Sequence, residues 1–326
     1  MPIIFVHGVA SRLKEDHGDH DKVWETIKEN LRKYIAPKIS EYPDRVMIEE
    51  AYWGKLGVPV VEKSLPDDKR VVEIFQAKGS WLRRRLRDND IGPDFLPTLV
   101  KRSNDLLGYF LTRVVDQARK PINKQVTLFL GDVFTYLDKR GTPKEPGEIT
   151  KQLLDKLKKA HDNKNEKGGE PIVVLSHSMG GQLVYDAVSY YLPEMSKMHE
   201  YESEGYSDIR IDFWCAAASQ VGLFREMNLF HTDIESASQS SKKISFPDKH
   251  LKIWWNLWDA NDYLSFTAEP FFEDVLDDLY DSGQSFAKAH ISHFDQTDFY
   301  KEFSLMLKEA KDADWHRDKF LKRVRG

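Results

Sequence analysis

The short segment Ser176–Gly181 constrains the fold more than any other part of this chain. The apolar run Pro171–Leu175 precedes it, and the helix-like run Gln182–Val188 follows it. A short apolar run indicates a buried strand, and the small residues after it permit a sharp turn into a helix. The segment therefore predicts a strand–turn–helix junction, which is the building unit of an α/β protein with a parallel sheet.

The predicted turn is centred on Ser178, whose hydroxyl would stand above the carboxyl end of the strand and face the helix N-terminus. In the pattern Gly-x-Ser-x-Gly, Ser176 occupies the place of the first glycine and Gly180 that of the second. Serine at position 176 is a mild departure, because serine is also small. The alternative is a purely structural junction that happens to contain serines, since this short pattern alone is a weak signal of function.

Together with Phe5–Gly8, this junction resembles the α/β-hydrolase superfamily, in particular its lipase- and esterase-like members. The resemblance implies one catalytic α/β domain over residues 1–326, with a mostly parallel central sheet. The His-Gly turn normally follows the third strand of that fold, whereas here it follows the first, Pro2–Val6. The resemblance therefore implies a sheet lacking the first two strands. It also implies an oxyanion hole made by the backbone amides of Val9 and Met179.

The candidate acid lies after the predicted strand 251–258. A serine hydroxyl is a weak nucleophile that needs a histidine base, and the histidine needs a carboxylate to orient it. In the superfamily these groups follow the chain order serine, acid, histidine. The loop contains Asp259 and Asp262. We expect Asp262 to be the acid, because the second acid of similar loops usually points into the site. Asp259 would then be a turn residue that binds its own backbone.

The candidate base lies in the loop before a predicted helix at 299–307. His290 and His293 both occur there. The family pattern resembles His-x-x-aromatic, which favours His290 as the base and puts His293 at the aromatic position. His177 is a third candidate by proximity, but its place before the serine directs it beneath the turn.

Residues 54–124 form a connection far longer than the dozen or so residues that a parallel crossover needs. Long insertions of this kind are usually functional, and helical spacing within this one predicts an inserted helical cap or lid. Its segment 81–87 interleaves basic residues with Trp and Leu, which fits either an anionic membrane surface or, as we favour, a solvated helix face balanced by nearby aspartates. The segment 125–132 fits a strand or a buried helix equally.

The remaining elements are predicted from periodicity and turn residues. We expect a helix with Val23, Trp24, Ile27 and Leu31 on one face, capped by Asp21, and a second at 149–160 with Ile149, Leu153, Leu154 and Leu157 inward. A charged linker, 161–170, would follow it. The further strands are expected at 45–53, 209–216 and 274–280.

The loop 15–21 alternates Asp and His, which could suggest a metal site. We favour a solvated loop, because no closing partner is evident in the sequence. No metal and no organic cofactor is therefore expected.

Composition excludes few functions. The formal net charge is −5 and the pI about 6.1, which gives no global attraction to nucleic acid. The single cysteine, Cys215, lies in an apolar strand and is expected to be a core residue. The N-terminal residues do not resemble a signal peptide, and no apolar run approaches the ~20 residues of a membrane span. A cytoplasmic enzyme is the simplest expectation.

The expected activity is hydrolysis of a carboxylic ester, from a small molecule or a lipid, through an acyl-enzyme on Ser178. Thioesters and amides use the same machinery and remain alternatives. A phospholipase recruited to a membrane surface by residues 83–87 is a further alternative, as is a non-catalytic binding module on the same fold. The sequence indicates neither an oligomeric state nor a pathway.

Overall fold

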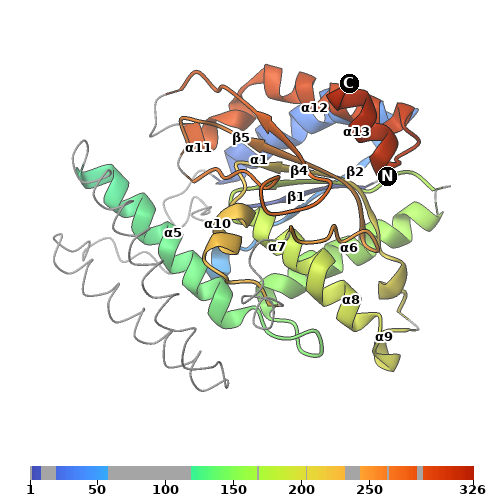
Figure 1. Ribbon diagram of the computed structural model, residues 1–326, viewed down its shortest axis with the longest axis horizontal. Coiled ribbons are helices and arrows are strands. Elements are labelled where there is room, and N and C mark those ends of the chain that lie inside the picture. Colours follow the sequence, from blue (N-terminus) through green and yellow to red (C-terminus); the bar gives the residue numbers. More distant parts are fainter. Residues whose placement is uncertain are drawn as a thin grey trace.

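The computed structural model describes residues 2–8, 20–57, 119–166, 169–202, 204–231, 243–262, 264–284 and 289–326. These residues form an α/β fold in which one parallel sheet lies between layers of helices (Figure 1). Most of the predicted cap falls outside the described residues, including the whole of 81–87. The described part of 54–124 consists of a short 3-10 turn, Gly54–Leu56, and the first residues of a long helix that begins at Arg119.

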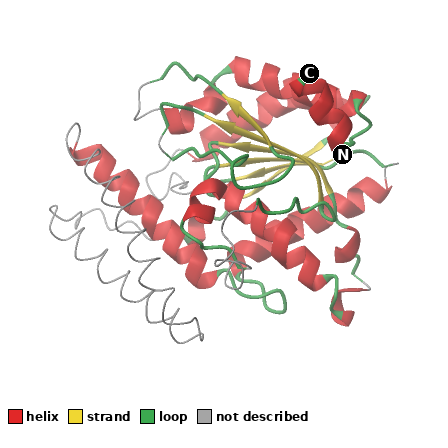
Figure 2. Cartoon of the chain, viewed as in Figure 1, coloured by secondary structure: helices red, strands yellow, loops and turns green. Residues whose placement is uncertain are grey.

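The sheet has six strands in the order β2-β1-β3-β4-β5-β6, and all five pairings are parallel (Figure 2). Strands β1, β3 and β4 are almost entirely buried, as expected for a parallel sheet that is covered on both faces. Their bounds are β1 Pro2–Val6, β2 Met47–Ala51, β3 Val173–His177, β4 Ile211–Ala217, β5 Leu251–Trp258 and β6 Leu276–Leu279.

The helices cover both faces of this sheet. Those described are α1 His20–Asn30, α2 Ala36–Ile39, α5 Arg119–Lys139, α6 Glu148–Glu166, α7 Gly180–Asp186, α8 Leu192–Met195, α9 His199–Glu202, α10 Val221–Glu226, α11 Ala289–Ser292, α12 Thr297–Asp312 and α13 Arg317–Arg325. Short 3-10 or π segments lie at Leu31–Ile35, Pro43–Arg45, Ala187–Tyr191, Tyr206–Asp208 and His293–Asp295.

Two hydrophobic cores result from the alternation of side chains along each strand. In β1, Phe5 packs with α1 and α12 on one face, whereas Val6 packs with α6 and α7 on the other. Across β4 and β5, Trp214 and Trp254 are register partners whose rings stack with centroids 4.4 Å apart. Cross-strand aromatic pairs of this kind are a main source of sheet stability, so the centre of the sheet is well fixed.

The predicted strands and inward helix positions are largely confirmed. Cys215 is fully buried, and burial raises the pKa of its thiol, so it is a core residue. The segment 125–132 lies within α5 and is therefore helical. All four apolar positions that were expected to face inward from α6 are buried, namely Ile149, Leu153, Leu154 and Leu157.

Three local predictions are wrong. Helix α1 begins at His20, so Asp21 lies in the first turn and is not the N-cap. Val23 is 39% exposed, because it sits at the edge of the face that buries Trp24. Helix α6 continues to Glu166 and so occupies much of the expected linker 161–170, because a charged run is as compatible with an exposed helix as with a loop.

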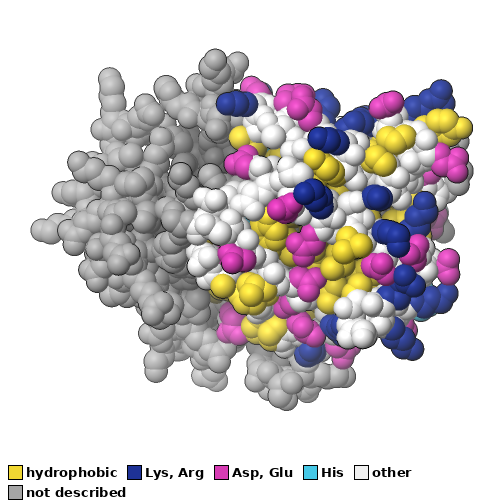
Figure 3. All heavy atoms as spheres, turned by 90° about the horizontal axis from the view of Figure 1, so that it is seen from above, with side chains coloured by type: hydrophobic (Ala, Val, Ile, Leu, Met, Phe, Trp, Pro, Cys, Tyr) yellow, Lys and Arg dark blue, Asp and Glu magenta, His cyan; other side chains and the backbone are white. Residues whose placement is uncertain are grey.

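The surface carries no dominant charge on the face shown in Figure 3, where acidic and basic side chains are interspersed over the described residues. This agrees with the modest net charge of the sequence. None of the described helices combines the length and apolar character that crossing a membrane requires.

Replacing Gly180 should test how closely α7 approaches the end of β1. A Cβ at this position would lie 2.4 Å from the carbonyl oxygen of Val6 and 2.7 Å from that of His7. Both are backbone atoms that cannot move aside. We expect Gly180→Ala to lower the free energy of unfolding by about 1–3 kcal/mol, measured by urea denaturation.

Ser189→Ala is the matched control, because the Ser189 hydroxyl makes only a local hydrogen bond, to the carbonyl of Tyr185 four residues earlier. It should cost less than about 1 kcal/mol. Alanine at 180 is also the better helix former by about 1 kcal/mol. A neutral or stabilised Gly180→Ala protein would therefore show that α7 does not approach β1 so closely.

Candidate functional site

Ser178 occupies a sharp turn between β3 and α7. Its φ angle is 55°, a left-handed conformation that is uncommon for a residue with a side chain. The backbone N–H of Ser178 donates to the carbonyl of Ala217 at 3.0 Å, which ties the turn to the end of β4. A non-glycine residue held in this region is typical of functional turns.

The turn is crowded from both sides, and this explains the small residues around it. A Cβ on Gly8 would lie 2.7 Å from the Cβ of Ser178, and one on Gly181 would lie 2.3 Å from the Ser219 hydroxyl. The Gly8 contact places the residue after His7 directly against Ser178. The two motifs that carried the family resemblance are therefore adjacent in space.

A chain of two hydrogen bonds joins Ser178, His290 and Asp262. The Ser178 Oγ lies 2.9 Å from His290 Nε2, and His290 Nδ1 lies 2.7 Å from Asp262 Oδ2. A carboxylate can only accept, so Nδ1 carries the proton and Nε2 is left to accept from the hydroxyl. This arrangement can remove a proton from the serine as it attacks an electrophile and can stabilise the imidazolium that results.

The two aspartates of the loop after β5 have different partners. Asp262 is buried, and its second oxygen accepts from the backbone N–H of Leu264 at 2.9 Å. Asp259 accepts from the backbone N–H groups of Asn261 and Ser282, at 2.8 and 3.1 Å. Asp262 is thus the one that reaches His290, and Asp259 binds turn backbone.

The other two histidine candidates do not touch Ser178 through their rings. His177 donates from Nε2 to the backbone carbonyl of His290 at 2.7 Å. Burial holds the pKa of His177 well below its ordinary value, so it is neutral. His293 is fully buried beside the rings of Tyr280 and Phe299, and burial lowers its pKa to about 4.

Gln220 is a site residue that the sequence did not reveal. Its Nε2 donates to Ser178 Oγ at 3.0 Å, and the side chain is fully buried. It follows the small-residue turn at the end of β4, the strand next to β3. Its position at the carboxyl edge of a neighbouring parallel strand was the available signal, but an uncharged amide attracts little notice in a sequence.

Of the two predicted amide donors, Met179 and Val9, the structure describes Met179. Met179 is buried and directly precedes the first residue of α7. Val9 lies outside the described residues. Two residues earlier, the backbone carbonyl of His7 accepts a hydrogen bond from Trp53 Nε1 at 2.7 Å, which fixes the start of that turn.

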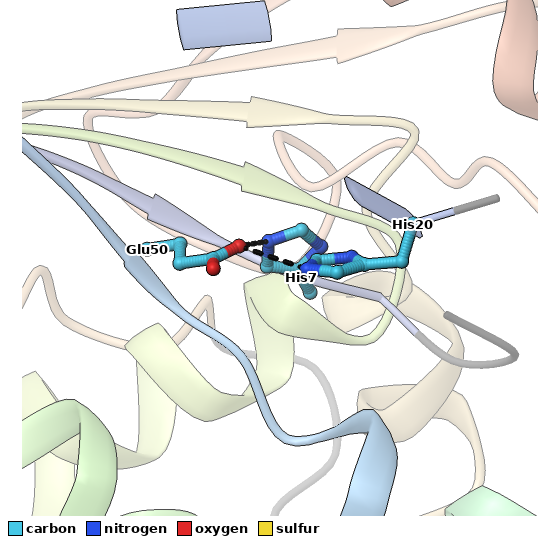
Figure 4. A group of neighbouring side chains, drawn as sticks. All are labelled: His7, His20 and Glu50. Atoms are coloured by element: carbon cyan, nitrogen blue, oxygen red, sulfur yellow. Dashed lines mark hydrogen bonds and ion pairs between the residues drawn. The ribbon is translucent and has the colours of Figure 1, made fainter. Parts of the chain in front are cut away.

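A second polar cluster lies beside this turn and joins His7, His20 and Glu50 (Figure 4). His7 Nε2 and His20 Nε2 lie 2.8 and 3.1 Å from the same carboxylate oxygen, Glu50 Oε2. Burial alone would raise the pKa of Glu50, but hydrogen bonds from both histidines outweigh it and lower the pKa to about 2. Burial also lowers the pKa of His7. The expectation of a solvated loop is wrong for His20, which is buried; residues 15–19 lie outside the described residues.

Comparison with known proteins gives no relative for this chain. No protein-family model matches it, and neither a curated protein nor a solved structure does. The function is therefore inferred from the contacts of Ser178, His290 and Asp262.

The buried His293 should make stability depend on pH. Its pKa is about 4 in the folded protein against 6.5 as the ordinary value, so between these pH values the unfolded chain binds a proton that the native protein excludes. Stability should therefore fall as the pH decreases from about 6.5 to 4, by on the order of 3 kcal/mol for this residue.

The measurement is urea denaturation of wild type and His293→Gln at a series of pH values. The variant should show the smaller loss of stability across that window, whatever its stability at pH 7.5. His316→Gln, at an exposed residue, is the control and should follow the wild type. Equal pH slopes for wild type and His293→Gln would contradict the burial argument.

Proposed function

We propose that this protein is a serine hydrolase of the α/β-hydrolase class that cleaves carboxylic esters. The observation that carries the proposal is the hydrogen-bonded chain from Ser178 through His290 to Asp262, with contacts of 2.9 and 2.7 Å. The left-handed turn at Ser178 and the six-stranded parallel sheet support it, because both belong to the arrangement that such enzymes use.

The reaction would proceed in two halves. In the first, Ser178 Oγ attacks the carbonyl carbon while its proton passes to His290 Nε2. The bond to the leaving oxygen then breaks, and His290 returns the proton to the departing alcohol. In the second, water attacks the acyl group, again with His290 accepting a proton and then giving it to Ser178 Oγ as the acid leaves.

Charge develops on the carbonyl oxygen in each half. We infer that the backbone amide of Met179 donates to it, with Val9 as the second donor. Each such donor typically contributes about 3–4 kcal/mol of transition-state stabilisation. Asp262 would hold the His290 ring in the required tautomer, and Gln220 would hold the Ser178 hydroxyl in place between attacks.

The contact between His290 and Ser178 bears on the alternative functions. A non-catalytic module would be favoured if no histidine reached Ser178, and the 2.9 Å contact of His290 speaks against that. Thioester and amide cleavage use the same residues and stay open. Recruitment to membranes depends on residues 83–87, which lie outside the described residues, so it stays a prediction from the sequence.

Covalent labelling tests the proposal at Ser178. A fluorophosphonate probe phosphonylates a serine only when a neighbouring base activates it. Wild-type protein should be labelled at one site, identified by mass spectrometry, and Ser178→Ala should not be labelled. Ser292→Ala is the control and should keep its labelling. The Ser292 hydroxyl donates to the carbonyl of Ala289 and takes no part in the hydrogen bonds that join Ser178, His290 and Asp262. An unlabelled wild type, or labelling that survives Ser178→Ala, would refute the proposal.

Exchange of each aspartate for asparagine separates the two candidate acids. We expect Asp262→Asn to lower kcat on p-nitrophenyl esters by about 10³–10⁴-fold, because the amide would favour the wrong tautomer of His290. Asp259→Asn should lower kcat by less than about tenfold, since it perturbs a turn and leaves the hydrogen bonds among Ser178, His290 and Asp262 intact. Thermal melts of both proteins identify any loss from unfolding. The assignment of Asp262 fails if the two effects are reversed.

A further inference from the structure

The cluster of His7, His20 and Glu50 brings together three elements that are far apart in the sequence. His7 follows β1, His20 is the first residue of α1, and Glu50 lies on β2. Figure 4 shows both imidazole rings directed at the Glu50 carboxylate. One ligand atom from each residue lies within 4.8 Å of the other two.

The rings are held in place by their surroundings. His7 is 3% and His20 5% exposed. The His20 ring stacks on Tyr52 with centroids 4.0 Å apart, and the His7 ring meets Phe5 edge-on at 4.5 Å. Side chains fixed in this way lose little conformational entropy on binding a ligand, so the donor atoms are preorganised.

The donor atoms are grouped closely enough to contact one metal ion. In a tetrahedral zinc site with bonds of about 2.0–2.2 Å, neighbouring ligand atoms lie roughly 3.3 Å apart. Here the two Nε2 atoms lie 2.8 and 3.1 Å from one carboxylate oxygen. These are hydrogen-bond distances, slightly shorter than the ligand spacing of a zinc site. An ion that replaced the two N–H protons would therefore need only a small outward shift of the three side chains.

We propose that His7 Nε2, His20 Nε2 and the Glu50 carboxylate bind a divalent transition-metal ion, with Zn²⁺ the best match. Two imidazoles and a carboxylate are a donor set that zinc accepts, and water supplies the fourth ligand. The hard ions Mg²⁺ and Ca²⁺ prefer oxygen ligands and are excluded by the two nitrogens.

The position of the site indicates a structural role. His7 precedes Gly8, whose added Cβ would lie 2.7 Å from the Cβ of Ser178. An ion at the cluster would tie the turn after β1 to α1 and β2, and so fix the backbone that lies against Ser178. The site does not depend on the proposed hydrolase activity, because its ligands are separate from Ser178, His290 and Asp262.

Metal binding by the full-length chain tests this proposal without an activity assay. The protein is treated with a chelator, and Zn²⁺ is then added in competition with a chromophoric indicator. We expect one ion per chain, bound more tightly than about 10 µM, together with a rise in Tm on addition of Zn²⁺. Substituting Co²⁺ should give visible absorption bands that are typical of four-coordinate nitrogen and oxygen ligation.

Two variants remove ligands with little change of shape. Glu50→Gln and His20→Gln should each weaken Zn²⁺ binding by more than about tenfold and abolish the rise in Tm. Glu49→Gln is the matched control on the same strand, because the Glu49 carboxylate pairs with Lys156 and Lys159 on α6. His161→Gln controls for adventitious binding by a partly exposed histidine. Both controls should bind Zn²⁺ as the wild type does.

Two results would overturn the proposal. One is no binding by the wild type at that concentration, which would leave a purely hydrogen-bonded cluster. The other is binding that is equal in Glu50→Gln and Glu49→Gln, which would place the ion elsewhere. Since Gln keeps the size of Glu, Glu50→Gln should fold even if His20→Gln does not. Loss of metal binding with covalent labelling of Ser178 intact would separate this site from the proposed function.

Discussion

The pairing of β3 between β1 and β4 is the interaction on which the rest of the structure depends. Because these strands are parallel, their carboxyl ends lie at one edge of the sheet, and the loops that leave them meet there. The turn at Ser178, the turn at Gly8 and the segment that carries Gln220 all leave this edge. The next strand, β5, adds the loop with Asp262 to the same edge. A slip of β3 by one residue would exchange its buried faces and separate these groups.

Much of the Ser178 site followed from the sequence, for a physical reason. A sharp strand-to-helix turn needs small residues around one serine, so the turn has a local signature. The acid and the base have no such signature. The chain order and spacing that the family resemblance implies offered Asp259 or Asp262 as the acid and favoured His290 over His293 and His177 as the base. In the structure, His290 contacts both Asp262 and Ser178. The roles of these residues in catalysis rest on the proposal.

What the sequence did not reveal consists mainly of contacts between distant segments. Gln220 reaches Ser178 from a neighbouring strand, and no periodicity marks it. The cluster around Glu50 joins residues 7, 20 and 50, and only the packing of α1 against the β1–β2 pair brings them together. The segment 125–132 was ambiguous because a short apolar run fits a strand or a helix. The structure places it in a 21-residue helix, so it is helical.

The hydrogen bond from His177 to the carbonyl of His290 joins two parts of the site that the chain itself separates. His177 is the neighbour of Ser178, so the same short segment carries the serine and anchors the backbone of its partner. A movement of the turn would carry both groups together, and the gap between hydroxyl and imidazole would change little. Small movements of the surrounding loops should therefore change the distance between the Ser178 hydroxyl and the His290 ring very little.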